Sequence, residues 1–181
     1  MPYEPPPELA ALSLGEVAEL VAARKLPPVS QWSPEAVGDS EMRIAADGRW
    51  FHQGGEIKRA AMVRAFASLL MRDEDGQHWL VTPSQKLSID VDDAAFIAID
   101  VKQEDGALAF RLNTDDLVIA DAEHPIRAEG DPDTPALYLG VRGGTEARLN
   151  RSTYGQLAEI ALAGGDLSVT SRGTCFSLRP A

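Results

Sequence analysis

The sequence has a single cysteine, Cys175, and no apolar run of about 18 residues, and both absences narrow what the protein can be. A lone cysteine excludes an intrachain disulfide and agrees with a reducing compartment. Without a long apolar run, no helix is expected to span a membrane. Residues 1–8 are proline-rich and acidic, and they lack the basic and apolar regions of a signal peptide. We therefore predict a cytoplasmic protein that does not bind membranes.

The motifs of common enzyme classes are also missing. No Gly-x-Ser-x-Gly segment presents a nucleophilic serine, and residues 140–144 lack the Lys-Ser/Thr of a phosphate-binding loop. The three histidines, at positions 52, 78 and 124, lie far apart in the sequence, so they do not indicate a metal site. The pairs Asp92-Asp93 and Asp115-Asp116 fall in expected turns, which favours solvated carboxylates over an acid–base pair. The sequence predicts no catalytic residue, no metal ligand and no cofactor.

Positive charge is scarce: 17 Lys and Arg stand against 28 Asp and Glu, for a formal net charge of −11. Such a chain is not expected to bind nucleic acid polymers, which require a basic surface. The charge is also uneven, because residues 73–133 hold 16 acidic and 4 basic residues, whereas residues 138–181 hold 3 acidic residues and 5 arginines. Either the basic segment pairs with the acidic loops, or its arginines line a small anion site. The sequence leaves both interpretations open.

The periodicity of apolar residues predicts three helices among many short strands. Ser13 and Glu16 form a capping box that should start a helix reaching about Lys25, before Pro27-Pro28. Further helices are expected at 60–71 and 152–163, and strands at 42–45, 49–52, 56–57, 78–82, 87–91, 96–101, 107–112, 117–120, 136–142, 167–171 and 175–178. Because few helices accompany many strands, the fold class is α+β with mostly antiparallel sheets.

A strand–helix–strand module is predicted to occur twice. Gly54-Gly55 precedes a short strand, Arg59 and the helix at 60–71; Gly143-Gly144 precedes a strand, Arg151 and the helix at 152–163. We accordingly divide the chain into an N-terminal helix and proline-rich arm (1–28), a first α+β repeat (29–84) and a β-rich second domain containing the second repeat (85–181). Ligand sites are common at domain interfaces, so the seam between the repeats is the expected site.

Arg59 and Arg151 are expected at helix starts, where the helix dipole disfavours a cation. An internal carboxylate, for example Glu56 or Glu146, can offset them, or the two guanidinium groups can hold a ligand phosphate or carboxylate. Trp50 and His52 are a stacking wall for a planar group in the second interpretation, whereas in the first Trp50 belongs to the core.

Several segments together resemble the bacterial DUF1285 family, whose biochemical function is unknown. They are residues 47–59, 66–70, 80–83, 89–96, 138–142, 146–149 and 151–154. The resemblance implies a duplicated α+β core, a second domain similar to a pleckstrin-homology (PH) barrel capped by a helix, and a shared interface that binds a small ligand of nucleotide-like type in signalling.

The resemblance also assigns ligand-binding positions. These are Trp50, His52, Arg59, Thr82, Lys86, Phe96, Arg142, Arg148, Arg151 and Tyr154, and Pro83 belongs to the same pattern. The chain departs from the family at Gln85, where a glutamate is usual, and at Ala95, where a proline is usual. The first departure removes an expected partner of Lys86.

The resulting hypothesis is a non-catalytic cytoplasmic protein of signal transduction that binds a small anionic, for example nucleotide-like, ligand between its repeats. One alternative is a metal-independent enzyme acting on a phosphorylated small molecule, with His52 as general base. Another is a structural module that binds a protein partner along an exposed strand edge.

Overall fold

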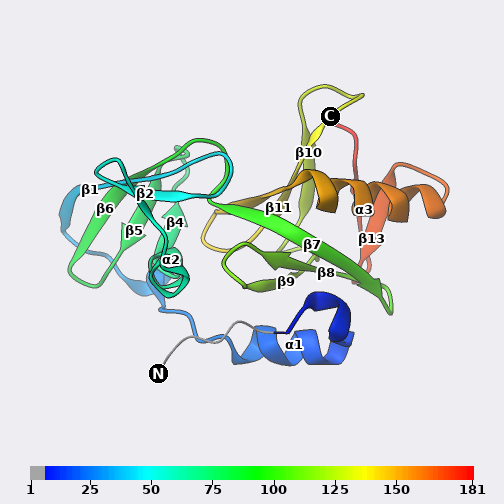
Figure 1. Cartoon of the computed structure of the whole chain (residues 1–181), viewed down its shortest axis with the longest axis horizontal. Coiled ribbons are helices and arrows are strands. Elements are labelled where there is room, and N and C mark those ends of the chain that lie inside the picture. Colours follow the sequence, from blue (N-terminus) through cyan, green and yellow to red (C-terminus); the bar gives the residue numbers. More distant parts are fainter. Residues whose placement is uncertain (1–6) are drawn as a thin grey trace.

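The computed structural model describes residues 7–181, which form two six-stranded sheets, three α-helices and a β-hairpin (Figure 1). The two sheets lie side by side along the long axis of the molecule, and the N-terminal helix runs beneath the second sheet. The α+β class predicted from the sequence is confirmed. Within residues 7–181, no helix is long and apolar enough to cross a membrane.

The N-terminal arm packs on the second domain. After the 3₁₀ turn η1 (Leu9–Ala11), helix α1 (Leu14–Ala23) begins with the predicted capping box. The Ser13 hydroxyl accepts from the backbone N–H of Glu16, and the Glu16 carboxylate accepts from the backbone N–H of Ser13. Val17 is buried in a small apolar cluster with residues of strands β8 (Ala107–Leu112) and β9 (Leu117–Ile119) of the second domain. The linker, residues 24–35, contains the turn η2 (Val29–Gln31) and leads to the first domain.

The first domain is one sheet with one helix. Its elements are β1 (Ala36–Ile44), β2 (Trp50–His52), β3 (Gly55–Ile57), α2 (Ala60–Ala67), β4 (Leu70–Arg72), β5 (His78–Val81) and β6 (Gln85–Val91). The strand order is β3-β2-β1-β6-β5-β4, and only the central pair β1–β6 is parallel. The boundary expected after residue 84 falls inside this sheet, because β6 completes it.

The second domain repeats that strand plan. Its elements are β7 (Phe96–Glu104), β8 (Ala107–Leu112), β9 (Leu117–Ile119), β10 (Ile126–Glu129), β11 (Ala136–Gly140), β12 (Glu146–Leu149), α3 (Arg151–Ala163), β13 (Ser168–Ser171) and β14 (Thr174–Ser177). The order is β10-β11-β12-β7-β8-β9, again with one central parallel pair, β7–β12. The described strands form an open sheet with β9 and β10 at its two edges, so they do not close into a PH-like barrel.

The duplication therefore lies in the sheets. Each sheet consists of two three-stranded meanders, joined by a parallel pair between the first and sixth strands. The helices do not follow the repeat: α2 lies between the two meanders of its domain, whereas α3 follows the sixth strand. The repeat predicted from the sequence therefore differs from the structural repeat, because it aligns β3, an edge strand of the first sheet, with β12, a central strand of the second.

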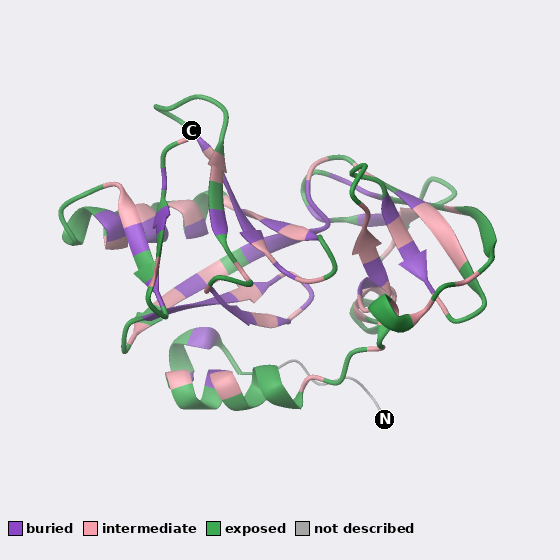
Figure 2. Ribbon diagram, turned by 180° about the vertical axis from the view of Figure 1, so that it is seen from behind, coloured by how far each residue is buried: buried purple, intermediate pink, exposed green. Residues whose placement is uncertain are grey.

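One apolar core runs through both domains. A single cluster of buried side chains includes Ile44, Trp50 and Leu80 of the first sheet and Phe96 and Leu157 of the second domain. Buried residues accordingly line the strands of both lobes in Figure 2. The shared cluster gives the two domains a common apolar contact rather than a polar, solvated one.

Gly144 allows the backbones of the two domains to meet. The backbone N–H of Arg72, at the end of β4, donates to the Gly143 carbonyl at 2.8 Å. Gly144 has φ of +79°, and a Cβ at this position would lie 2.5 Å from the Arg72 carbonyl oxygen. Only glycine fits here without displacing the other domain.

We expect Gly144→Ala to destabilise the protein more than Gly106→Ala. Gly106 has nearly the same φ, +75°, but its added Cβ would meet nothing within 4 Å. The control should lose about 1 kcal/mol from backbone strain, and Gly144→Ala about 1–3 kcal/mol more from the clash. Urea unfolding of both variants measures the difference; equal losses would show that the glycine contact does not hold the domains together.

Candidate functional site

A buried carboxylate joins three parts of the chain. Asp116, in the β8–β9 turn, is 5% exposed and lies 2.9 Å from Nε of Arg24, which follows α1. Arg64 of α2 and Arg142 of the β11–β12 turn each approach it to 3.6 Å. The Thr114 hydroxyl donates to the same carboxylate at 2.7 Å. Asp116 thus connects the N-terminal arm, the first domain and the second domain.

The three arginines keep this carboxylate ionised. Burial by itself raises the pKa of Asp116. The charge of Arg142 and the hydrogen bond from Thr114 act in the opposite direction, and together with the two other arginines they bring the pKa below its ordinary value. Asp116 is therefore charged at neutral pH.

Arg142 is only partly satisfied by these contacts. One Nη donates to the carbonyl of Ala67 at 3.2 Å, and the guanidinium lies 5.1 Å from the centre of the Phe96 ring. Burial lowers the pKa of Arg142, although Asp116 acts against that effect. Its Nε is buried and has no hydrogen-bond partner among residues 7–181. An unpaired buried donor costs about 1–3 kcal/mol, so a ligand acceptor at this atom would remove a penalty.

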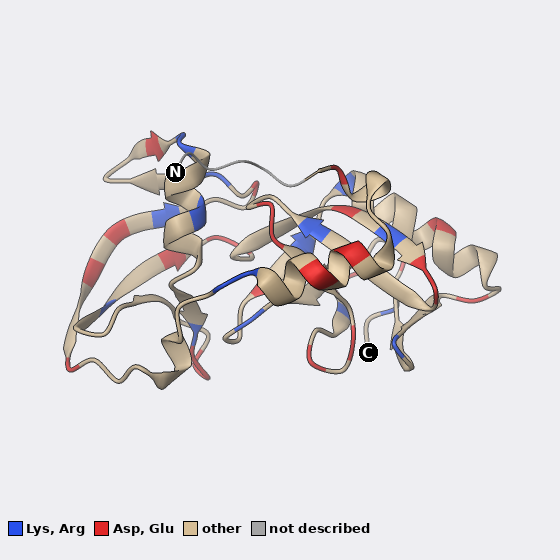
Figure 3. Ribbon diagram, turned by 90° about the horizontal axis from the view of Figure 1, so that it is seen from below, with Lys and Arg blue, Asp and Glu red and all other residues tan. Residues whose placement is uncertain are grey.

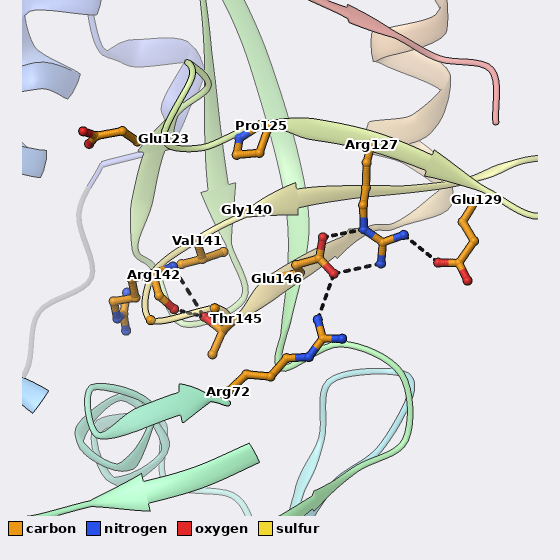
Figure 4. Close-up of a pocket in the computed structure, with 12 residues that line it drawn as sticks. Arg72, Glu123, Pro125, Arg127, Glu129, Gly140, Val141, Arg142, Thr145 and Glu146 are labelled. Carbon is orange, nitrogen blue, oxygen red and sulfur yellow. Dashed lines mark hydrogen bonds and ion pairs between the residues drawn. The ribbon is translucent and has the colours of Figure 1, made fainter. Parts of the chain in front are cut away.

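Arg142 borders a large cleft, the polar cleft, of about 670 Å³ between β4 and strands β10–β12 (Figure 4). Glu146 occupies its centre, where it accepts from Arg127 at 2.6 and 2.8 Å and from Arg72 at 3.3 Å. Arg127 also binds Glu129 at 2.6 Å. The guanidinium of Arg142 extends away from this network. The cations of the polar cleft are thus neutralised by its own carboxylates.

His78 lies on β5, paired with Arg72 of β4, which lines the polar cleft. Burial, with the charge of Arg72 as the next cause, lowers the pKa of His78 to about 4. The imidazole is consequently neutral at physiological pH and adds no cation to the polar cleft.

A second cleft, the linker cleft, lies beneath the linker and has a volume of about 320 Å³. Its lining residues come from the linker (Leu26, Pro27, Pro28, Val29 and Ser30), from the first domain (Ser68, Leu70, Met71 and Arg72) and from the second domain (Arg142 and Gly143). Its charged residues are two arginines, and no carboxylate lines it. A third cleft, of about 390 Å³ under α1, has Arg24, Arg142 and Arg172 facing Asp116, Asp121 and Glu123. Of these three clefts around Arg142, the linker cleft alone has an excess of positive charge.

Comparison with known proteins identifies the family of this two-domain chain. Residues 27–94 match the DUF1285 N-terminal domain, described as a domain of unknown function. Residues 95–178 match the DUF1285 C-terminal domain, described as a protein of unknown function. The chain belongs to the DUF1285 family. The two matches meet between β6 and β7, where the two sheets also separate.

Two solved DUF1285 structures are similar to this chain. One, from Silicibacter pomeroyi DSS-3, is 38% identical with a TM-score of 0.75 and covers 91% of this chain and 95% of that one. The other, from Shewanella baltica OS155, is 24% identical with a TM-score of 0.54, covers 65% of this chain and 90% of that one, and shows the fold alone. The comparison with curated proteins finds no match.

The structure brings only two of the ten predicted DUF1285 site residues together at the seam: Arg142 and Phe96, through their stacking contact. Phe96 is fully buried in β7, and Trp50 is 1% exposed in β2, where it stacks on Phe66. Trp50 is therefore a core residue, although its Nε1 is buried without a hydrogen-bond partner among the described residues.

The other predicted residues lie elsewhere. His52, Arg59 and Arg151 are exposed, at the end of β2, the N-cap of α2 and the first residue of α3. Thr82 bonds within the β5–β6 turn, and Lys86 lies 4.4 Å from the Trp79 ring centre. Arg148 binds Asp93 at 2.8 Å, and Tyr154 packs against the core. The carboxylates considered for the helix-start arginines have other partners: Glu56 contacts Arg49, and Glu146 contacts Arg72 and Arg127.

The sequence interpretation missed Asp116 and its partners Arg24 and Arg64. Asp115-Asp116 was expected to be a solvated turn, and the turn is present, but Asp116 is buried because arginines from three distant segments cover it. The partners stand at positions 24, 64 and 142, so no local spacing indicates the cluster.

We expect Asp116→Asn to lower the free energy of unfolding by about 2–3 kcal/mol at pH 7, because it leaves a cluster of guanidinium groups without their carboxylate. The folded-state pKa of Asp116 is lowered, so its charge stabilises the fold above the unfolded-state pKa of about 3.9. That contribution is lost as the pH falls through the folded-state pKa. The difference between wild type and variant should therefore shrink below about pH 4.

Urea unfolding at pH 7 and at pH 3 measures both effects. Asp92→Asn is the control, because it removes a half-exposed carboxylate that pairs with Arg43 at 3.2 Å, outside the arginine cluster. A loss in Asp92→Asn as large as that in Asp116→Asn, or a difference from wild type that does not change with pH, would contradict the assignment.

Proposed function

We propose that this DUF1285 protein is a non-catalytic cytoplasmic sensor that binds a small anionic ligand in the linker cleft. The observation that carries the proposal is the combination of Arg142, whose buried Nε lacks an acceptor in the described part of the chain, with a cleft whose described lining has two arginines and no carboxylate. Charge-assisted hydrogen bonds contribute about 1.5–3 kcal/mol each, so two or three support micromolar binding.

The lining of the linker cleft supports a role in signalling. A ligand there would contact the linker, the first domain and the second domain at once. Arg142 also contacts Asp116, which holds Arg24 at the start of the same linker. Binding would thus favour one arrangement of arm, linker and domains over others, which is the physical basis of a ligand-controlled signal.

The enzyme alternative receives less support from the geometry. Its proposed general base, His52, is exposed at the end of β2 and lines none of the three clefts around Arg142. The alternative of a structural module has the strand edges β3, β4, β9 and β10 to offer, but these are short strands of three or four residues. Short edges are a common means of avoiding strand addition.

The proposal predicts that an anion from a panel of nucleotides, phosphorylated metabolites, organic acids and inorganic phosphate raises the melting temperature. At 100 times its dissociation constant, a ligand adds about 2.7 kcal/mol of stability, which corresponds to a shift of about 5–10 °C for a chain of this size. Arg142→Lys retains the charge that Asp116 needs but removes the Nε–H, so it should weaken binding about tenfold or more.

Arg127→Lys is the matched control, because it makes the same exchange in the polar cleft, where Glu146 and Glu129 occupy the guanidinium. It should leave the shift caused by the anion unchanged. A flat response to the whole panel would refute anion binding, and equal weakening by both variants would remove the site from the linker cleft.

A further inference from the structure

The linker cleft is mainly apolar. Leu26, Pro27, Pro28 and Val29 cover it from the linker, and Leu70 and Met71 of β4 line it from the first domain. Leu26 remains 38% exposed, which makes it one of the few large apolar side chains in the described part of the chain that the fold leaves partly in water. An apolar group in this cleft would remove such surface from water, at about 25 cal/mol per Å².

The polar groups of the cleft suit a single small anion. The Nη2 of Arg142 already donates to the Ala67 carbonyl and lies 3.6 Å from Asp116. Its buried Nε–H has no acceptor among residues 7–181. Arg72 shares its guanidinium with Glu146 at 3.3 Å. These few remaining donors match one carboxylate better than a phosphate, which presents more oxygens and more charge.

The volume of the cleft points in the same direction. About 320 Å³ lies at the lower end of the range of ligand pockets, roughly 300–1,000 Å³. A cleft of this size, with cations at Arg72 and Arg142 and aliphatic side chains over the rest of its lining, is complementary to a compact amphiphilic molecule.

We propose that the ligand is an organic acid with one carboxylate and an aliphatic body, with the carboxylate on Arg142 and the body between Leu26 and Met71. This inference rests on the proposed function and specifies its ligand class. The linker then serves as the apolar cover of the site, and Arg142 as its charged end.

A series of straight-chain acids tests the inference by isothermal titration calorimetry on the full chain. Because each buried methylene contributes about 0.8 kcal/mol, the dissociation constant should fall about tenfold from butyrate to hexanoate and again to octanoate. Octanol, which has the same chain without the charge, should bind at least tenfold more weakly than octanoate.

A pair of variants tests where the aliphatic body of the ligand binds: Leu26→Gln in the linker cleft, and Leu20→Gln as its control. Both leucines are 38% exposed, but Leu20 belongs to α1 and lines a different cleft. Leu26→Gln should weaken octanoate binding about tenfold and reduce the dependence on chain length, whereas Leu20→Gln should change neither. Circular dichroism and thermal unfolding verify that both variants are folded.

The outcomes separate the two proposals. If nucleotides or phosphate bind through Arg142 but affinity for the acids does not depend on chain length, the ligand class is wrong and the anion site stands. If chain length matters but Leu20→Gln has the same effect as Leu26→Gln, the apolar body lies outside the linker cleft and the inference fails. If no anion binds at all, the proposed function fails with it.

Discussion

The architecture depends on how one buried carboxylate balances three guanidinium groups. Asp116 contacts Arg24, Arg64 and Arg142. These arginines belong to three segments that lie far apart in the sequence. A buried charge is tolerated only where opposite charges and hydrogen bonds compensate its lost hydration. The arm, α2 and the β11–β12 turn must therefore converge on the β8–β9 turn, and this convergence produces the clefts on either side of Arg142.

The same pairing accounts for the uneven charge of the sequence. The basic C-terminal segment contacts carboxylates of the acidic middle segment: Arg142 contacts Asp116, Arg148 contacts Asp93 and Arg172 contacts Asp121. Basic and acidic ribbon segments are correspondingly interspersed over the face shown in Figure 3, without a continuous basic stripe. Of the four arginines that the sequence offered for a ligand, Arg142 and Arg148 thus have internal carboxylate partners, whereas Arg59 and Arg151 are exposed on the surface. The linker cleft differs from its neighbours because no carboxylate lines it.

Local signals in the sequence predicted local structure well. The capping box at Ser13 and Glu16 is present, and the strands expected at 42–45 and 49–52, and at 96–101 and 107–112, pair as antiparallel neighbours. Helix α2 is shorter than its apolar pattern indicated, because Leu70–Arg72 pairs with β5 as a strand. The parallel pairs β1–β6 and β7–β12 and the cluster around Asp116 join residues that lie 26 or more positions apart, and no periodicity or capping rule encodes such contacts. The internal match between residues 54–71 and 143–163 and the family resemblance both predicted a duplication.

The pairing of the first strand with the sixth in each sheet also determines when each sheet can form during synthesis. The central pair of the first sheet needs β6, so that sheet cannot be completed until residue 91 has emerged from the ribosome. Helix α1 precedes both sheets in the chain, yet its apolar face packs on β8 and β9, which end at residue 119. Val17 of this helix thus lacks its partner strands until β8 and β9 have been made, although the first sheet can already be complete. The arm can therefore pack only after residue 119 has been made, and the nascent chain carries α1 unpacked until then.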